Sequence, residues 1–123
     1  MLNKIITRMV CIALATLVVM VMPEQLRAQS AQSTELIALI NKGAYLVDVR
    51  TPEEFAEGSV TGAVNIPLDE IENQIAQFKD KKHIVVFCKS GYRAGEAKEL
   101  LAKHGFTNVS NAGSWEDVAK LKK

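Results

Sequence analysis

The chain has 123 residues, of which 48% are apolar and 24% are charged, and its formal net charge at pH 7 is +1. This is the composition of one compact globular domain with a single hydrophobic core. The near-neutral charge argues against a nucleic-acid partner, because nucleic-acid binding depends on an excess of basic side chains.

The start of the chain predicts a secretory signal peptide. Lys4 and Arg8 precede an apolar run over residues 9–22, and a polar region rich in small residues follows. This run has 14 residues, fewer than the roughly 20 that a helix needs to cross a bilayer. We therefore expect cleavage after Ala28 or Ser30, export into a periplasm and no stable membrane anchor afterwards. An uncleaved, tilted anchor is the alternative, because flanking residues can extend a short span.

Removal of residues 1–28 would leave 12 basic and 13 acidic side chains and a single cysteine, Cys88, because Cys11 lies in the apolar run. Exported proteins usually hold their thiols in disulfides, so an unpaired thiol needs a reason. A lone cysteine is ordinarily a small buried hydrophobic residue. The residues that surround Cys88 favour a chemical role instead.

After the predicted signal peptide, residues 29–33 are expected to form a short mobile leader and residues 34–123 the folded domain. Apolar runs of strand length alternate with segments of helical spacing, which predicts an α/β fold: a mainly parallel sheet flanked by helices on both faces. Strands are expected at Tyr45–Val49, Ala63–Ile66, His83–Phe87 and Asn108–Ser110.

Several helix starts are marked in the sequence. Thr51-Pro52-Glu53-Glu54 offers an N-cap, a proline at the first helical position and a capping-box glutamate, and this helix should end at Gly58. The same spacing of cap and acid recurs at Asp69 with Glu72 and at Ser114 with Asp117.

Apolar spacing predicts which helix faces are buried. The helix after Asp69 should bury one face, and a helix from about Tyr92 to His104 should end at Gly105, with Phe106 packed back against it. The residues on the two buried faces are Leu68, Ile71, Ile75 and Phe78 in the first helix and Ala94, Ala97 and Leu101 in the second.

Cys88 occupies a predicted strand-to-helix turn, where α/β folds bind ligands and a helix N-terminus favours an anion. A thiolate is such an anion, and the nearby cations Lys89 and Arg93 would stabilise it. Gly91 allows the turn to direct successive N–H groups at the sulfur, and Ser90 offers a hydroxyl donor.

The segment CKSGYRA resembles the active-site loop of the rhodanese family, Cys-x-x-Gly-x-Arg. Upstream, LVDVRTPEEFAEGSVTGAVNIPL is similar to the family hallmark Val-Asp-Val-Arg, Glu-Glu-Phe, Gly and Gly-Ala-x-Asn-Ile-Pro, and NVSNAGSWEDV resembles its last strand and turn. The resemblance spans about Thr34 to Leu121. The chain has Ser59-Val60-Thr61 where the family commonly has His-Ile-Pro, and Ala112-Gly113 where a glycine pair is common.

The resemblance implies a thiosulfate sulfurtransferase that needs no cofactor. Cys88 would be the catalytic nucleophile that takes sulfur from a small anionic donor such as thiosulfate, holds it as a persulfide and passes it to cyanide or a thiol, including a thiol on a protein. The loop residues Lys89, Ser90, Gly91, Tyr92 and Arg93 would bind the substrate, with the two cations attracting the donor.

Other residues near the predicted site receive supporting roles. Asp48 is expected to orient the catalytic loop, and Arg50 to form an exposed, structural ion pair with Glu53 or Glu54. Tyr92 and Trp115 either line the pocket mouth or serve packing. His83 and His104 are expected at the surface, and the spacing of residues around them predicts no metal site.

Two alternatives remain at this point. Cell-cycle dual-specificity phosphatases share the rhodanese fold, but their signature places five residues between Cys and Arg, whereas four separate Cys88 from Arg93. The shorter loop is expected to fit a sulfur atom better than a phosphoryl group. The second alternative is a non-catalytic domain that carries persulfide or binds sulfide.

Overall fold

The computed structural model describes residues 23–123. The chain divides into two compact units, with the boundary between Thr34 and Glu35. Most of the predicted signal peptide falls on residues 1–22 and so lies outside the described residues. Within the described part, no helix has both the length and the hydropathy needed to cross a membrane.

Helix α2 (Glu24–Asn41) is the first described element, and no helix is predicted there from the sequence. It includes residues 29–33, which the sequence predicts to be a short mobile leader. The stretch contains neither glycine nor proline and is rich in Ala, Gln, Leu and Glu, all of which are favourable in helices. The helix ends shortly before Gly43, whose φ of +89° is left-handed.

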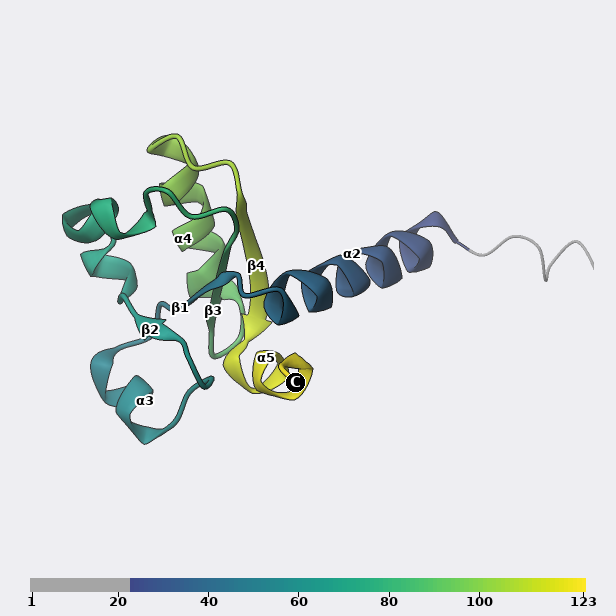
Figure 1. Cartoon of the computed structure of the whole chain (residues 1–123), viewed down its shortest axis with the longest axis horizontal. Coiled ribbons are helices and arrows are strands. Elements are labelled where there is room, and N and C mark those ends of the chain that lie inside the picture. Colours follow the sequence, from purple (N-terminus) through teal and green to yellow (C-terminus); the bar gives the residue numbers. More distant parts are fainter. Residues whose placement is uncertain (1–22) are drawn as a thin grey trace, which may run out of the picture. The chain divides into compact units, whose positions relative to one another are not determined.

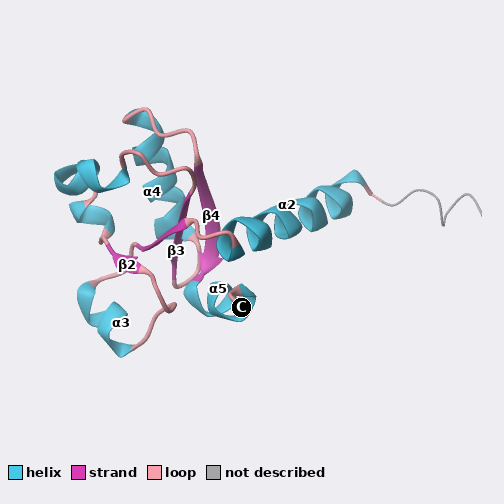
Figure 2. Cartoon of the chain, viewed as in Figure 1, coloured by secondary structure: helices cyan, strands magenta, loops and turns pink. Residues whose placement is uncertain are grey.

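Four parallel strands form the sheet in the order β2-β1-β3-β4, drawn in magenta in Figure 2. Their bounds are Tyr45–Asp48 for β1, Val64–Asn65 for β2, Ile84–Cys88 for β3 and Val109–Ser114 for β4. All four predicted strands are confirmed, although β4 continues to Ser114 where the prediction ended at Ser110. The α/β class is confirmed as well.

The central strand β3 is buried along its whole length, and its side chains alternate between two hydrophobic clusters. Ile84, Val86 and Cys88 belong to one cluster, whereas Val85 and Phe87 belong to the other. This alternation follows from the two-residue period of a strand. Because both faces of β3 are covered by other elements, its sequence contains no polar residue.

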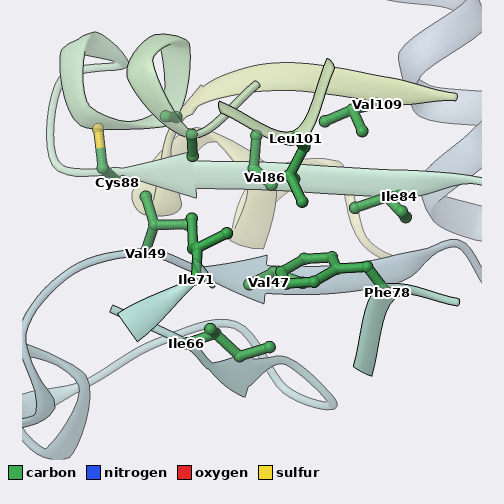
Figure 3. Packing of buried hydrophobic residues seen from close by; sticks show 12 residues of the cluster. Val47, Val49, Ile66, Ile71, Phe78, Ile84, Val86, Cys88, Leu101 and Val109 are labelled. Atoms are coloured by element: carbon green, nitrogen blue, oxygen red, sulfur yellow. The ribbon is translucent and has the colours of Figure 1, made fainter. Parts of the chain in front are cut away.

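Helix α4 (Tyr92–Lys103) and the short helices η1 (Leu68–Glu70) and η2 (Glu72–Phe78) cover the first cluster, part of which is shown in Figure 3. The predicted buried face of α4, Ala94, Ala97 and Leu101, is confirmed. Residues of α2 and of α5 (Trp115–Leu121) cover the second cluster, through Ile40 and Val118 among others. Figure 1 shows how these elements follow one another along the chain.

Helix α3 (Pro52–Glu57) begins with the predicted capping box: the Thr51 hydroxyl accepts a hydrogen bond from the Glu54 backbone N–H, and the Glu54 side chain accepts one from the Thr51 backbone N–H. The hydroxyl of Ser114 likewise accepts a hydrogen bond from the backbone N–H of Asp117 at the start of α5. Both predicted starts are therefore confirmed. Gly105, at the end of α4, has the expected left-handed φ of +91°.

The prediction of a helix capped by Asp69 is wrong. The segment folds as two short 3-10 turns, η1 and η2, with Pro67 in front of the first, no side-chain cap and a kink at Gln74. In a 3-10 helix, residues three apart lie above one another. Leu68 with Ile71, and Ile75 with Phe78, have this spacing, so each turn can bury its own pair without a continuous helical face.

Candidate active site

Cys88 is the last residue of β3, and α4 begins four residues later at Tyr92, so the predicted strand-to-helix turn is confirmed. The cysteine is 1% exposed and belongs to the first hydrophobic cluster, at the end of the strand in Figure 3. Its Sγ accepts a hydrogen bond from the backbone N–H of Gly91, with a distance of 2.9 Å between nitrogen and sulfur. A donor in this position stabilises negative charge on the sulfur.

Two features of the turn after Cys88 favour glycine at position 91. The φ of Gly91 is +99°, in the left-handed region. A Cβ added at this position would lie 3.2 Å from the Cα of Gly113, at the end of β4. The turn therefore approaches the neighbouring strand more closely than a side chain permits.

Arg93 lies in the first turn of α4 and binds Glu54 through two hydrogen bonds, of 2.7 Å to Oε1 and 3.0 Å to Oε2. The hydrogen bond from Arg93 is the main reason why the pKa of Glu54 is lowered to about 2. The same bond raises the pKa of Arg93, and the charges of Cys88 and Asp48 add to this effect. The guanidinium is thus close enough to Cys88 to feel a charge there, but its hydrogen bonds are directed to Glu54.

Three of the predicted loop residues face solvent. Lys89, Ser90 and Tyr92 are exposed, and 75% of the Tyr92 surface is accessible. These side chains belong to the turn that follows the buried sulfur. Trp115, at the start of α5, is partly buried against the second cluster, and its ring lies 4.9 Å from the Arg50 guanidinium carbon.

The expectation that Arg50 forms an exposed ion pair with Glu53 or Glu54 is wrong. Arg50 is 4% exposed and binds Asp48 through both its Nε and its Nη2, at 2.8–3.1 Å. Its Nη2 also donates to the carbonyl oxygen of Gly58 at 2.6 Å. Asp48 is the last residue of β1 and Arg50 follows two positions later, so the two side chains are close enough to pair.

Among the described residues, no hydrogen bond joins the Asp48 side chain to the loop that follows Cys88. Its carboxylate accepts from the Arg50 side chain, from the Arg50 backbone N–H at 3.0 Å and from the Ser59 hydroxyl at 2.7 Å. Ser59 is one of the positions where the chain departs from the rhodanese pattern. Asp48 therefore fixes the segment after β1, and any effect on the loop is indirect.

Two residues that the structure brings to the site are not predicted from the sequence. Glu54 was interpreted only as part of a capping box, yet it also binds Arg93, which lies 39 positions away. Asn111, in β4, donates from its side-chain amide to the carbonyl oxygen of Gly91 at 3.0 Å. No local spacing signals either contact, because both partners come together only when the sheet forms.

His83 and His104 are exposed, as predicted. The described residues contain no group of three or more His, Cys, Asp or Glu side chains that could hold a metal ion. A pocket of about 440 Å³ lies at the start of β1 and β3, where Tyr45, Lys82 and His83 contribute to its walls. This is the end of the strands opposite to Cys88, so the pocket is separate from the candidate site.

Several known proteins are similar to this chain in sequence. Thiosulfate sulfurtransferase PspE of Escherichia coli strain K12 is 42% identical over 78 residues, which cover 62% of this chain and 75% of that protein. Human thiosulfate:glutathione sulfurtransferase is 34% identical over 106 residues, or 73% of this chain and 92% of that protein.

Two solved structures also match. A rhodanese with anions from E. coli superposes with a TM-score of 0.57 and 40% identity, covering 63% of this chain and 93% of that one. The human single-domain sulfurtransferase TSTD1 superposes with a TM-score of 0.61 and 33% identity, covering 73% and 94%. The family model described as the rhodanese-like domain matches residues 32–121. This chain, with its cysteine at the turn after the central strand, therefore belongs to the family of rhodanese-like domains.

Proposed function

We propose that the protein is a sulfurtransferase that moves sulfane sulfur from thiosulfate, or a similar small anionic donor, to a thiophilic acceptor through a persulfide on Cys88. The observation that carries the proposal is the hydrogen bond from the Gly91 N–H to Cys88 Sγ at the start of α4. It provides a donor for a sulfur anion at a strand-to-helix turn. The sulfurtransferases among the relatives support the same class of reaction.

The first step forms a persulfide. The Cys88 thiolate attacks the outer sulfur of thiosulfate, a new S–S bond forms, and the original S–S bond breaks so that sulfite leaves with its electron pair. The Gly91 N–H is placed to stabilise the attacking thiolate. Lys89 and the Arg93–Glu54 pair border the turn, and the exposed ammonium of Lys89 is the group that would attract an anionic donor.

The second step returns the enzyme to its starting state. An acceptor, either cyanide or a thiolate, attacks the outer sulfur of the persulfide, and the electrons of the broken S–S bond return to Cys88. The product is thiocyanate or a new persulfide. A thiol on another protein is one acceptor of this kind. Neither step requires a metal ion or an organic cofactor.

We also propose that the protein is exported to a periplasm and that its basic and apolar first residues form a signal peptide that is cleaved off. Cleavage after Ala28 or Ser30 would remove Cys11 and leave Cys88 as the sole cysteine. The intact mass of the chain recovered from a bacterial periplasm tests this, and we expect the mass of a chain cleaved after Ala28 or Ser30. An uncleaved chain in the membrane fraction would contradict the proposal.

Thiocyanate formation from thiosulfate and cyanide by the full chain tests the reaction. We expect Cys88→Ser to abolish turnover and the mass gain of one sulfur atom after incubation with thiosulfate. Cys11→Ser, which replaces the other cysteine, should retain both and serves as the matched control.

The other outcomes separate the alternatives. A stable sulfur adduct without turnover would favour a persulfide carrier, since a carrier loads once and waits for its partner. Absence of both adduct and turnover in the folded wild-type chain would contradict sulfur transfer altogether. Hydrolysis of an aryl phosphate that depends on Cys88 would then favour a phosphatase.

A further inference from the structure

A side chain of β4 holds the turn that presents the Gly91 N–H to Cys88. Gly91 donates to Cys88 Sγ through its nitrogen, and its carbonyl oxygen accepts from the Gly95 N–H at 2.9 Å and from Asn111 Nδ2 at 3.0 Å. The first of these acceptor contacts is an ordinary bond of the α4 helix. The second ties the catalytic turn to β4 and is made by a side chain.

Asn111 is itself held in one orientation. Its Oδ1 accepts from the backbone N–H of Gly113 at 2.9 Å, so that both ends of the amide group have partners. This pairing fixes which end of the amide faces Gly91, because only the NH2 group can donate to a carbonyl oxygen. A carboxylate at this position could still accept from Gly113 but could not donate to Gly91.

Asn111 sits where β4 departs from regular pairing with β3. Val86 pairs with Asn111, but Cys88 pairs with Ser114, so β4 has one more residue than β3 over this stretch. Such a bulge redirects the side chains of the longer strand. Here the Asn111 amide reaches the start of α4, where a Cβ added at Gly95 would lie 3.5 Å from its Nδ2.

We infer that Asn111 is a positioning residue for the nucleophile: by holding the Gly91 carbonyl, it keeps the Gly91 N–H directed at Cys88 Sγ. The left-handed conformation of Gly91, with φ +99° and ψ −11°, is one that glycine leaves easily. A side-chain restraint from β4 limits this freedom. This inference rests on the proposed function of Cys88, and it assigns to Asn111 an effect on thiolate stability rather than a contact with substrate.

The test uses the full chain in a Cys11→Ser background, so that Cys88 is the only thiol. The rate of alkylation by iodoacetamide is measured across a pH series, together with kcat and KM for thiocyanate formation and the thermal midpoint. We expect Asn111→Ala to lower the alkylation rate at neutral pH about twofold to fivefold, the lower part of the effect of losing one hydrogen bond, because this bond is exposed to solvent. The pH profile should shift upward, and kcat should fall more than KM changes.

Asn111→Asp keeps the size of the side chain and the acceptor for Gly113 but removes the donor to Gly91 and adds a negative charge. It should shift the pH profile at least as far as the alanine variant. Asn108→Ala is the matched control, because Asn108 also donates from its amide to backbone carbonyls, those of Lys81 and Lys82, at the opposite end of β4. It should lower the thermal midpoint without moving the profile.

The inference is overturned if Asn111→Ala and Asn111→Asp, both folded, have the alkylation profile of the Asn108→Ala control. If the alanine variant does not fold, the isosteric aspartate variant decides the same comparison. Alkylation does not require a sulfur donor, so the two proposals can fail separately. A shifted profile in a chain that forms no thiocyanate would support the role of Asn111 and contradict the sulfurtransferase function.

Discussion

Gly91 shows how a single residue combines backbone conformation, packing and electrostatics. Its left-handed φ lets the chain turn directly from β3 into α4, and its lack of a side chain lets the turn lie against Gly113. The N–H that this conformation presents donates to Cys88 Sγ. Substitution of Gly91 should therefore affect stability and chemistry together, which most glycines at helix ends would not do.

Gly105 offers the comparison that separates these two effects. It too has a left-handed φ, of +91°, but a Cβ there would meet no atom within 4 Å. We expect Gly105→Ala to lower the free energy of unfolding by about 1–2 kcal/mol, the cost of a left-handed conformation for an ordinary residue, and to leave sulfur transfer unchanged. Gly91→Ala should cost more and reduce kcat about tenfold or more, because the N–H is displaced from the sulfur.

Urea unfolding and thiocyanate formation measure the two quantities. Equal sulfur-transfer rates in the Gly91→Ala and Gly105→Ala variants would contradict the role assigned to the Gly91 N–H. An equal loss of stability would contradict the close contact with Gly113.

At the scale of elements, the Glu54–Arg93 ion pair joins α3 to α4, and Glu54 simultaneously completes the capping box of α3. The two short segments that follow β1 and β3 are therefore coupled through one carboxylate. Capping alone accounts for the spacing of Thr51 and Glu54 in the sequence. The ion pair of Glu54 with Arg93 depends on the distance between the starts of α3 and α4, which is set only when the sheet has formed.

This ion pair predicts a pH-dependent contribution to stability. The pKa of Glu54 is lowered to about 2 from an ordinary value near 4.5, so the folded state favours the ionised carboxylate. The stabilisation is complete above about pH 4.5 and is lost as the pH falls towards 2. Because the side chains are 32% and 29% exposed, solvent screening limits the effect to about 1 kcal/mol.

Glu54→Gln should therefore reduce the free energy of unfolding at neutral pH, and the difference from the wild type should vanish as the pH approaches 2. Glu53→Gln is the control, since Glu53 lies in the same turn of α3 and outside this ion pair. Chemical denaturation across the pH series measures the difference. A difference that stays constant throughout the series would contradict the ion pair as its source.

At the scale of the whole unit, Arg50 connects three parts of the fold. Its guanidinium binds Asp48 at the end of β1 and the Gly58 carbonyl after α3, and it lies over the ring of Trp115 in α5. The described side chains include no buried nitrogen or oxygen atom without a hydrogen-bond partner. Burial of this pair is thus accompanied by complete hydrogen bonding, the condition under which buried charges are tolerated.

We expect Arg50→Met to lower the free energy of unfolding by about 3–5 kcal/mol, because it leaves the Asp48 carboxylate buried without its partner. Arg93→Met, which breaks the partly exposed pair with Glu54, should cost only about 1 kcal/mol. Arg50→Lys retains the charge but loses the two-pronged geometry and should lie between them. Urea unfolding measures these free energies. Similar losses of stability in Arg50→Met and Arg93→Met would contradict the buried role of Arg50.

Local patterns were sufficient for much of the fold and for the position of Cys88 at the turn after β3. The apolar run of β3, the capping box at Thr51 and the turn from Cys88 to Gly91 are short-range features whose physics depends on a few neighbouring residues. These were predicted and are confirmed. The segment over Leu68–Phe78 shows the limit of such patterns, because its apolar spacing suits both a helix and two 3-10 turns, and packing against the sheet selects the turns.

The sequence by itself determined the four strands, the starts of α3 and α5, the buried face of α4, the family resemblance and the position of the thiol, because periodicity and turn chemistry are encoded locally. Only the tertiary structure decided the partners of the charged and polar side chains: Arg50 with Asp48, Arg93 with Glu54 and Asn111 with Gly91. The latter two contacts cross from one element to another, and only the Arg50–Asp48 pair is buried. The assembled sheet sets both the distances and the solvent exposure that make one partner more favourable than another.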